Sequence, residues 1–322
     1  TGTAGSGSVL VVTGPGTATA GTAFNTLTVT AKDSHGNTVT GYSGTVHFTS
    51  IDSQGDLPND YSFVAGDNGT KTFTAKLKTA GNQTITATDT GTPSVTGTTG
   101  TIVVSADSAS QIAINAGNNQ SATAGTAVTT PPSVIVKDAY GNPVAGASVT
   151  FAVATGGGSA SGTSATTSNS GIATITSWTL GSTAGSNTLT ATSGSLTGSP
   201  LTFTATGAAG NGSVLEVTGP GTATAGTSFN TLTVTAKDSN GNTVTGYRGT
   251  VHFTSIDSQG DLPNDYSFAA GDNGTKTFTA KLKTAGNQTI TATDTGTPSV
   301  TGTTGTIVVS ADSASQIAIN AG

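Results

Sequence analysis

A long internal repeat limits the folds open to this chain more than any other feature of its sequence. Residues 8–117 recur as residues 213–322, displaced by 205 positions, and the two copies differ at only five places. A different segment of about the same length lies between them. Such a chain is expected to fold as an array of units of roughly 100 residues, a common size for one domain. The differing pairs are Val11/Glu216, Ala23/Ser228, His35/Asn240, Ser43/Arg248 and Val64/Ala269.

The middle segment shares its opening motifs with the repeated one. Thr-Ala-Gly-Thr begins at Thr19 and again at Thr123, and Lys-Asp-x-x-Gly-Asn begins at Lys32 and again at Lys137. We call the repeated segment A and the middle segment B, and we interpret both as variants of one unit. The predicted organisation is a linker at 1–7, A at 8–107, B at 108–207, a linker at 208–212, a second A at 213–312 and the start of a further B at 313–322.

Apolar and polar residues alternate over short runs in both units. In A, for example, Leu27, Val29 and Ala31 alternate with threonines, as expected for a strand with one buried face. Charged residues are only 8% of the chain, which disfavours amphipathic helices. Six such runs, with a shorter one near Phe63, predict an all-β fold of tandem immunoglobulin-like sandwiches with about seven strands each, in an elongated array.

The alternation is interrupted in B around the only tryptophan of the chain. Ile172 and Trp178 share one parity whereas Ile175 has the other, which suggests a β-bulge. Large aromatic side chains are usually buried, so we interpret Trp178 as part of the core or of a domain junction and not as a surface on which sugars stack.

The sequence of B resembles the bacterial immunoglobulin-like domains of the invasin and intimin type. The likeness begins with Val-Ile-Val-Lys-Asp-Ala-Tyr-Gly-Asn-Pro-Val-Ala-Gly at 134–146, continues with Ser-Val-Thr-Phe at 148–151 and reaches Gly-Ile-Ala-Thr at 171–174. A resembles more loosely a related repeat of giant bacterial surface proteins, with an additional loop from Asp52 to Tyr61. The resemblance implies an extracellular rod that holds a functional tip away from a cell surface.

The charged residues argue against nucleic-acid binding and against catalysis. A net charge of −6 does not suit a phosphate backbone. Lys137 and Asp138 are the only charged residues in B, so B cannot hold a catalytic triad or a carboxylate pair. In A, His35 follows Asp33 too closely along the chain for triad geometry, and His47 alternates outward among threonines. We therefore expect the chain not to be an enzyme. Separately, no apolar stretch is long enough to cross a membrane.

One acidic loop in A has the composition of a weak calcium site. It contains Asp52, Asp56 and Asp60, and Asp67 follows downstream. Oxygen-rich loops hold Ca²⁺ in extracellular modules, but aspartates are also ordinary turn residues, and the spacing is not that of an EF-hand. We expect a solvated loop without a cofactor, and calcium is the alternative that its composition suggests. Asn-x-Ser/Thr sequons make N-glycosylation chemically possible at Asn68, Asn82, Asn119 and Asn211.

Two main functions fit these features. The first is a structural spacer or stalk of an extracellular bacterial surface adhesin, and the second is the repeating subunit of a secreted or cell-surface fibre that self-assembles. A ligand-binding module that uses the acidic loop or Tyr42 is a third hypothesis. The expected partners are neighbouring repeats of the same chain, or further copies in a fibre, in an extracellular location at the bacterial surface or after secretion.

The two linkers differ in glycine content. Residues 106–110 between A and B contain no glycine, whereas residues 206–212 between B and the second A contain three. Glycine widens the conformational freedom of the backbone. This difference predicts a nearly fixed A–B joint and a hinge at the B–A joint.

Overall fold

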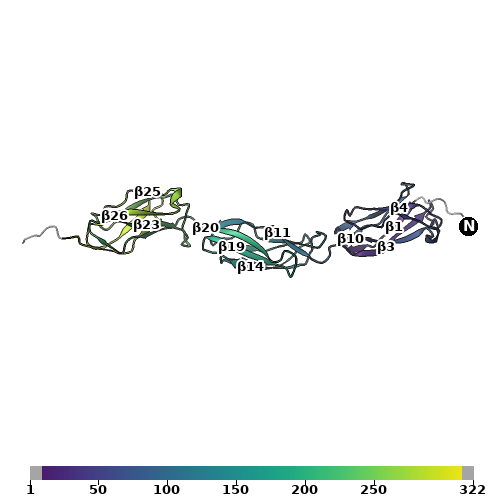
Figure 1. The fold of residues 1–322 in the computed structure, drawn as a ribbon, viewed down its shortest axis with the longest axis horizontal. Helices are drawn as coiled ribbons and strands as arrows, with labels where there is room; N and C mark the ends of the chain where they lie inside the picture. The colour runs from purple at the N-terminus through teal and green to yellow at the C-terminus, as the bar shows by residue number, and fades with distance from the viewer. Residues whose placement is uncertain (1–8, 314–322) are drawn as a thin grey trace, which may run out of the picture.

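Three β-sandwiches lie end to end along the chain and form an elongated array (Figure 1). The structure is a computed structural model, and it describes residues 9–313. The only helical elements among the described residues are two short 3₁₀ turns, Ala65–Asp67 and Ala270–Asp272. No helix in this part of the chain has the length and hydropathy needed to cross a membrane. The prediction of an all-β chain of tandem immunoglobulin-like sandwiches is confirmed.

The first domain contains more strands than predicted, because four of its ten strands are only two or three residues long. They form sheets in the orders β1-β3-β6, β2-β10-β7 and β5-β4-β8-β9, and all pairs are antiparallel except β2 with β10. The strands are β1 (Val9–Thr13), β2 (Thr17–Thr19), β3 (Ala23–Lys32), β4 (Thr45–Ser50), β5 (Tyr61–Ser62), β6 (Thr70–Lys76), β7 (Gly81–Gln83), β8 (Ile85–Asp89), β9 (Thr96–Thr98) and β10 (Ile102–Ser105).

The middle domain has the sheets β11-β13-β17, β12-β20-β19-β14-β16 and β15-β18. Its strands are β11 (Gln111–Ala116), β12 (Gln120–Thr123), β13 (Ser133–Lys137), β14 (Ser148–Thr155), β15 (Ser159–Ser161), β16 (Ser164–Thr166), β17 (Ile172–Thr174), β18 (Ser177–Thr179), β19 (Gly185–Thr192) and β20 (Leu201–Ala208).

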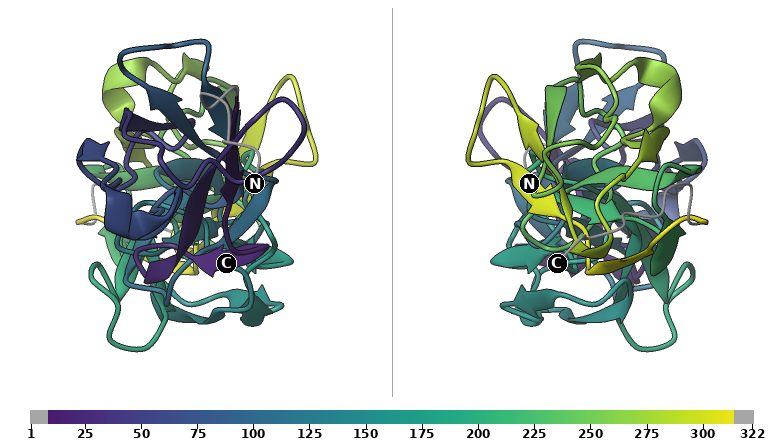
Figure 2. Two further views of the ribbon diagram at one scale, coloured as in Figure 1. Left: turned by 90° about the vertical axis from the view of Figure 1, so that its right-hand side faces the viewer. Right: turned by 90° about the vertical axis from the view of Figure 1, so that its left-hand side faces the viewer.

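The last domain repeats the arrangement of the first, and the three domains overlap when viewed along the array (Figure 2). Its strands are β21 (Val214–Thr218), β22 (Thr222–Thr224), β23 (Ser228–Lys237), β24 (Thr250–Ser255), β25 (Tyr266–Ser267), β26 (Thr275–Lys281), β27 (Gly286–Gln288), β28 (Ile290–Asp294), β29 (Thr301–Thr303) and β30 (Ile307–Ser310).

Each domain has its own hydrophobic core, and the predicted alternation identifies the residues in it. Leu27, Val29 and Ala31 on β3 are fully buried, whereas both members of each of the five differing A pairs are exposed. The face assignment is therefore confirmed for these positions. Phe73, which the alternation also places in the core, is only half-buried and packs edge-on against Phe48.

Trp178 is fully buried in the core of B, as predicted, but the β-bulge predicted around it is wrong. β17 pairs with β13, whereas β18, which carries Trp178, pairs with β15 without a shift of register. The chain thus passes from one sheet to another between these strands. Its alternation restarts because the second strand faces the core from a different sheet.

Candidate functional site: the acidic loop and the domain joints

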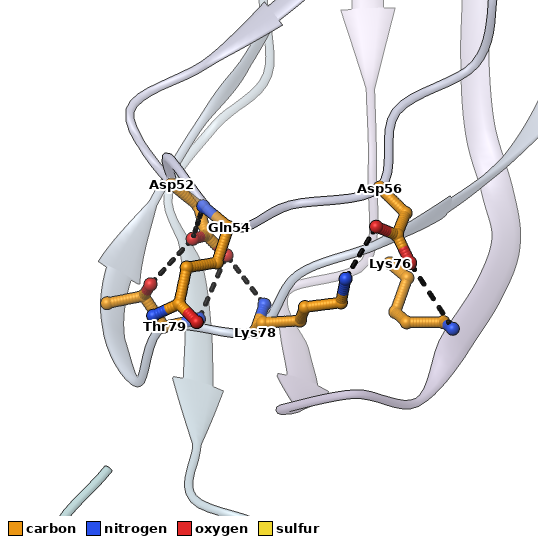
Figure 3. A network of polar contacts seen from close by, with 6 residues as sticks. All are labelled: Asp52, Gln54, Asp56, Lys76, Lys78 and Thr79. Carbon is orange, nitrogen blue, oxygen red and sulfur yellow. Dashed lines mark hydrogen bonds and ion pairs between the residues drawn. The ribbon is translucent and has the colours of Figure 1, made fainter. Parts of the chain in front are cut away.

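Asp52, the first calcium candidate, is buried and binds only groups of its own domain (Figure 3). One carboxylate oxygen accepts hydrogen bonds from the backbone N–H of Gln54 (3.0 Å) and the hydroxyl of Thr79 (2.6 Å). The other accepts from the N–H groups of Lys78 (2.6 Å) and Thr79 (2.9 Å). Burial raises the pKa of Asp52, but these hydrogen bonds outweigh that effect and keep the pKa below its usual value. Asp52 therefore anchors the segment at 78–79.

Asp56 lies in the same loop but binds lysine side chains instead (Figure 3). Its two oxygens are 2.5 Å from Nζ of Lys78 and 3.4 Å from Nζ of Lys76. The hydrogen bond from Lys78 is the main reason that the pKa of Asp56 lies below its usual value. These ion pairs are exposed, so each contributes little to stability.

The other two acidic candidates also have partners of their own. Asp60 accepts a 2.7 Å hydrogen bond from Nδ1 of His47 on the surface, where the alternation places that histidine. Asp67 accepts from the N–H of Val64 (2.9 Å) and pairs with Nζ of Lys71 (3.0 Å). Residues 9–313 contain no group of three or more acidic, histidine or cysteine side chains placed to hold a metal ion. The four aspartates are therefore spread over separate contacts.

Because lysines or backbone N–H groups already occupy Asp52 and Asp56, we expect calcium to have little effect on an A domain. A chelator should shift the midpoint of thermal unfolding by less than about 2 °C, and added CaCl₂ should not raise it, since a ligand stabilises only in proportion to its binding. A large fall with chelator that Asp56→Asn abolishes would instead establish a calcium site in this loop.

The structure does not support a ligand site at Tyr42, which is wrong as a candidate because it is buried. Its side chain is 8% exposed, and its hydroxyl donates a 2.5 Å hydrogen bond to the carboxylate of Asp89. Burial and this carboxylate raise the pKa of Tyr42 well above its usual value. The sequon asparagines are all exposed, and their glycosylation stays a prediction; they are Asn68, Asn82, Asn119 and Asn211.

The two linkers between domains are equally short, and each is fastened at its second residue. β10 ends at 105 and β11 begins at 111, while β20 ends at 208 and β21 begins at 214, so five residues lie in each gap. Gly207 belongs to β20 and is paired with β19, so it is not part of the linker. The carboxylate of Asp138 accepts a hydrogen bond from the N–H of Asp107 (3.0 Å), and that of Asp238 accepts one from Gly210 (2.8 Å).

The glycine-rich linker is thus held in the same way as the glycine-free one. Burial raises the pKa of Asp238, but its hydrogen bonds, including the one from Gly210, lower it to about 2, so the carboxylate stays charged. The predicted hinge was based on backbone freedom alone. The structure does not support it, because side-chain contacts restrain the linker.

A recess of about 570 Å³ lies at the B–A joint. Glycine, alanine, threonine, asparagine and valine residues line it, among them Gly185, Asn211 and Thr245. None of its lining side chains is charged at neutral pH. The recess therefore offers no charged or imidazole side chain for general acid–base chemistry, and its threonine hydroxyls have no such base among the lining residues.

Comparison with known proteins identifies the fold. A scan against family models and a search of curated proteins found no match. Among solved structures, the chain is similar to FdeC, an adhesin of Escherichia coli, at 22% identity and a TM-score of 0.52 over 95% of this chain and 99% of that one. It also matches InvD of Yersinia pseudotuberculosis at 18% identity and a TM-score of 0.47, over 92% of this chain and 96% of that one. Invasin, a bacterial integrin-binding protein, matches at 20% identity and a TM-score of 0.42, over 94% of this chain and 60% of that one. This chain therefore has the fold of tandem immunoglobulin-like domains that is found in bacterial surface adhesins.

Proposed function

We propose that these domains are spacer or stalk repeats of an extracellular bacterial surface adhesin and that they have no catalytic role. The observation that supports this most directly is the end-to-end array, in which an aspartate of the following domain fastens each five-residue linker. An array of this kind holds whatever lies at its far end at a fixed distance from the cell surface. Its partners are the neighbouring repeats of the same chain, and its place is the bacterial cell surface.

The surface of the array is consistent with such a passive role. Charged residues are only 8% of the chain. The described aspartates of the acidic loop bind lysine, histidine or backbone groups separately and do not form a common site. The fold shared with FdeC supports a place in a surface adhesin as an analogy only, because one fold hosts many functions.

A spacer and a self-assembling fibre differ in their behaviour in solution. We expect the purified chain to remain monomeric at millimolar concentration in sedimentation equilibrium, with a scattering profile of a rod three domains long. Filaments, or a mass that rises with concentration, would contradict the spacer and support the fibre. Electron microscopy of the same samples distinguishes ordered filaments from amorphous aggregates.

A further inference from the structure

The Asp-x-x-Gly-Asn turn occurs once in each domain and has the same internal hydrogen bonds each time. In B, one oxygen of Asp138 accepts from the N–H groups of Tyr140 (2.9 Å) and Asn142 (2.8 Å), and the other accepts from the side-chain amide of Asn142 (2.8 Å). Asp33 and Asp238 do the same in the two A domains. The turn therefore holds the asparagine side chain in a defined position.

In B, that asparagine extends to the domain before it. The side-chain amide of Asn142 donates to the backbone carbonyl of Lys78 (2.7 Å), and its carbonyl accepts from the backbone N–H of Ala80 (2.8 Å). Asn142 is buried, although it lies in a turn. The pair of bonds spans the A–B joint in both directions, as donor and as acceptor.

The B–A joint has the same pair of bonds. Asn242 donates to the carbonyl of Ser182 (2.8 Å) and accepts from the N–H of Ala184 (2.8 Å). The equivalent residue of the first domain, Asn37, keeps its bonds to Asp33 and is exposed. The asparagine is thus buried at the A–B joint, half-buried at the B–A joint and exposed in the first domain, so its burial depends on contact with another domain and not on the turn alone.

Contact with backbone atoms explains how one turn fits two kinds of neighbour. The contacted segments, Lys78-Thr79-Ala80 in A and Ser182-Thr183-Ala184 in B, differ in their first side chain but present the same carbonyl and N–H. A buried polar side chain holds each segment in shape. In A this is Asp52, and in B it is Asn187, which accepts from the N–H of Gly181 and donates to the carbonyl of Gly185.

The third residue of the turn makes a second contact with the preceding domain. Tyr140 packs on the core of the first domain, beside Gly21, where a Cβ would lie 2.2 Å from the tyrosine ring. At the other joint, the side chain of Asn240 donates a 3.2 Å hydrogen bond to the carbonyl of Ala124.

Both contacted regions belong to one rigid end of the preceding domain. Gly21 donates to the carbonyl of Leu77, and Gly125 donates to that of Gly181, so the Thr-Ala-Gly-Thr turn is bonded to the segment beside it in each case. Two contacts to one platform restrain both bending and rotation of the following domain, whereas a single contact would leave a pivot.

We propose that the Asp-x-x-Gly-Asn turn is a docking element that binds the end of the preceding domain and gives the A–B and B–A joints the same fixed geometry. Asn142 and Asn242 determine that geometry through backbone contacts, and the third turn residue distinguishes the two joints. The proposal deepens the spacer function by assigning the residues that make the spacer stiff, and it rests on that function only for its purpose.

The test measures the distribution of distances between spin labels in the full chain. The chain has no cysteine, so Thr74→Cys with Thr150→Cys labels the A–B joint, and Thr150→Cys with Thr279→Cys labels the B–A joint, all at exposed strand positions. We expect narrow distance distributions for both label pairs in pulsed electron–electron double resonance. Asn142→Ala should broaden the first at least twofold and leave the second unchanged, and Asn242→Ala should do the reverse.

Asn37→Ala is the matched control, because it removes the same side chain from the same turn, where the described residues place no contact with another domain. It should leave both distributions unchanged and shows the cost of the turn itself in thermal unfolding. If Asn142→Ala and Asn242→Ala also leave both distributions narrow, other contacts hold the joints and the proposal is wrong. Broad distributions in the unmutated chain would overturn it as well.

A glycine pair provides an independent test. Gly21 and Gly226 are equivalent and have φ of +75° and +80°, so alanine strains the backbone similarly at both. Of these two glycines, only Gly21 faces a neighbouring domain among the described residues. Gly21→Ala should therefore displace the mean distance of the first label pair, whereas Gly226→Ala should not; equal effects would contradict the second contact. None of these outcomes depends on whether copies of the chain form filaments, so the docking element and the spacer can fail separately.

Discussion

Replacing Trp178 with alanine should destabilise the B domain by about 3–5 kcal/mol, the range for removal of a buried large aromatic side chain. Trp178 is fully buried and is the first of the largest buried side chains in the molecule. A domain of this size loses about 4–8 °C of its unfolding midpoint per kcal/mol, so calorimetry should show a fall of more than about 10 °C in one transition. The transitions of the two A domains should stay in place.

Trp178→Phe separates packing from polarity at this site. The indole N–H has no hydrogen-bond partner among residues 9–313, so phenylalanine removes no protein hydrogen bond described there and keeps most of the apolar volume. We expect a loss of roughly 1–2 kcal/mol, well below that of alanine. If the two substitutions cost the same, or if neither moves the B transition, the core assignment of Trp178 is wrong.

Asp257→Asn should destabilise the last A domain by roughly 3 kcal/mol at neutral pH, because the new amide group would face hydrogen-bond donors. Asp257 is the counterpart of Asp52 and accepts from the N–H groups of Lys283 (2.6 Å) and Thr284 (3.0 Å). The first A domain is unchanged in the same molecule. One of two nearly coincident transitions should therefore separate from the other on calorimetry.

The effect should depend on pH in a defined direction. Burial raises the pKa of Asp257, but its hydrogen bonds lower it to about 2, below the usual value of 3.8. A folded-state pKa below the unfolded one contributes stability that is complete above about pH 4 and is lost as the pH falls through about 2. For Asp257 this amounts to about 2 kcal/mol. The variant should lose less stability than the unmutated chain between pH 4 and 2; a parallel loss would show that Asp257 does not carry this dependence.

The alternation of side chains was sufficient to predict the longer strands and most of their buried faces, but not the strands of two or three residues. Leu27, Val29 and Ala31 are buried as predicted because a strand with one face on a core has a fixed period of two. Around Trp178 the same rule was insufficient. Which sheet a strand joins depends on contacts far along the chain, and a change of sheet has the same local pattern as a bulge.

The joints show a second limit of sequence reasoning. Asp-x-x-Gly-Asn was correctly interpreted as a turn, since its internal bonds are local. The role of Asn142 depends on a carbonyl at Lys78, 64 residues away in another domain, and no local pattern reveals that distance. Glycine counts in the linkers predicted a hinge at the B–A joint because composition describes the backbone alone and not the side chains that restrain it.

The near identity of the A copies has a consequence for the gene. An unequal exchange between the two coding stretches would add or remove 205 residues, which is one A and one B. Each new boundary would still place an Asn-bearing turn on a Thr-Ala backbone segment, because those contacts do not depend on the side chains that differ. The length of the molecule could therefore change in whole steps during inheritance while the asparagine contact at every seam between domains is kept.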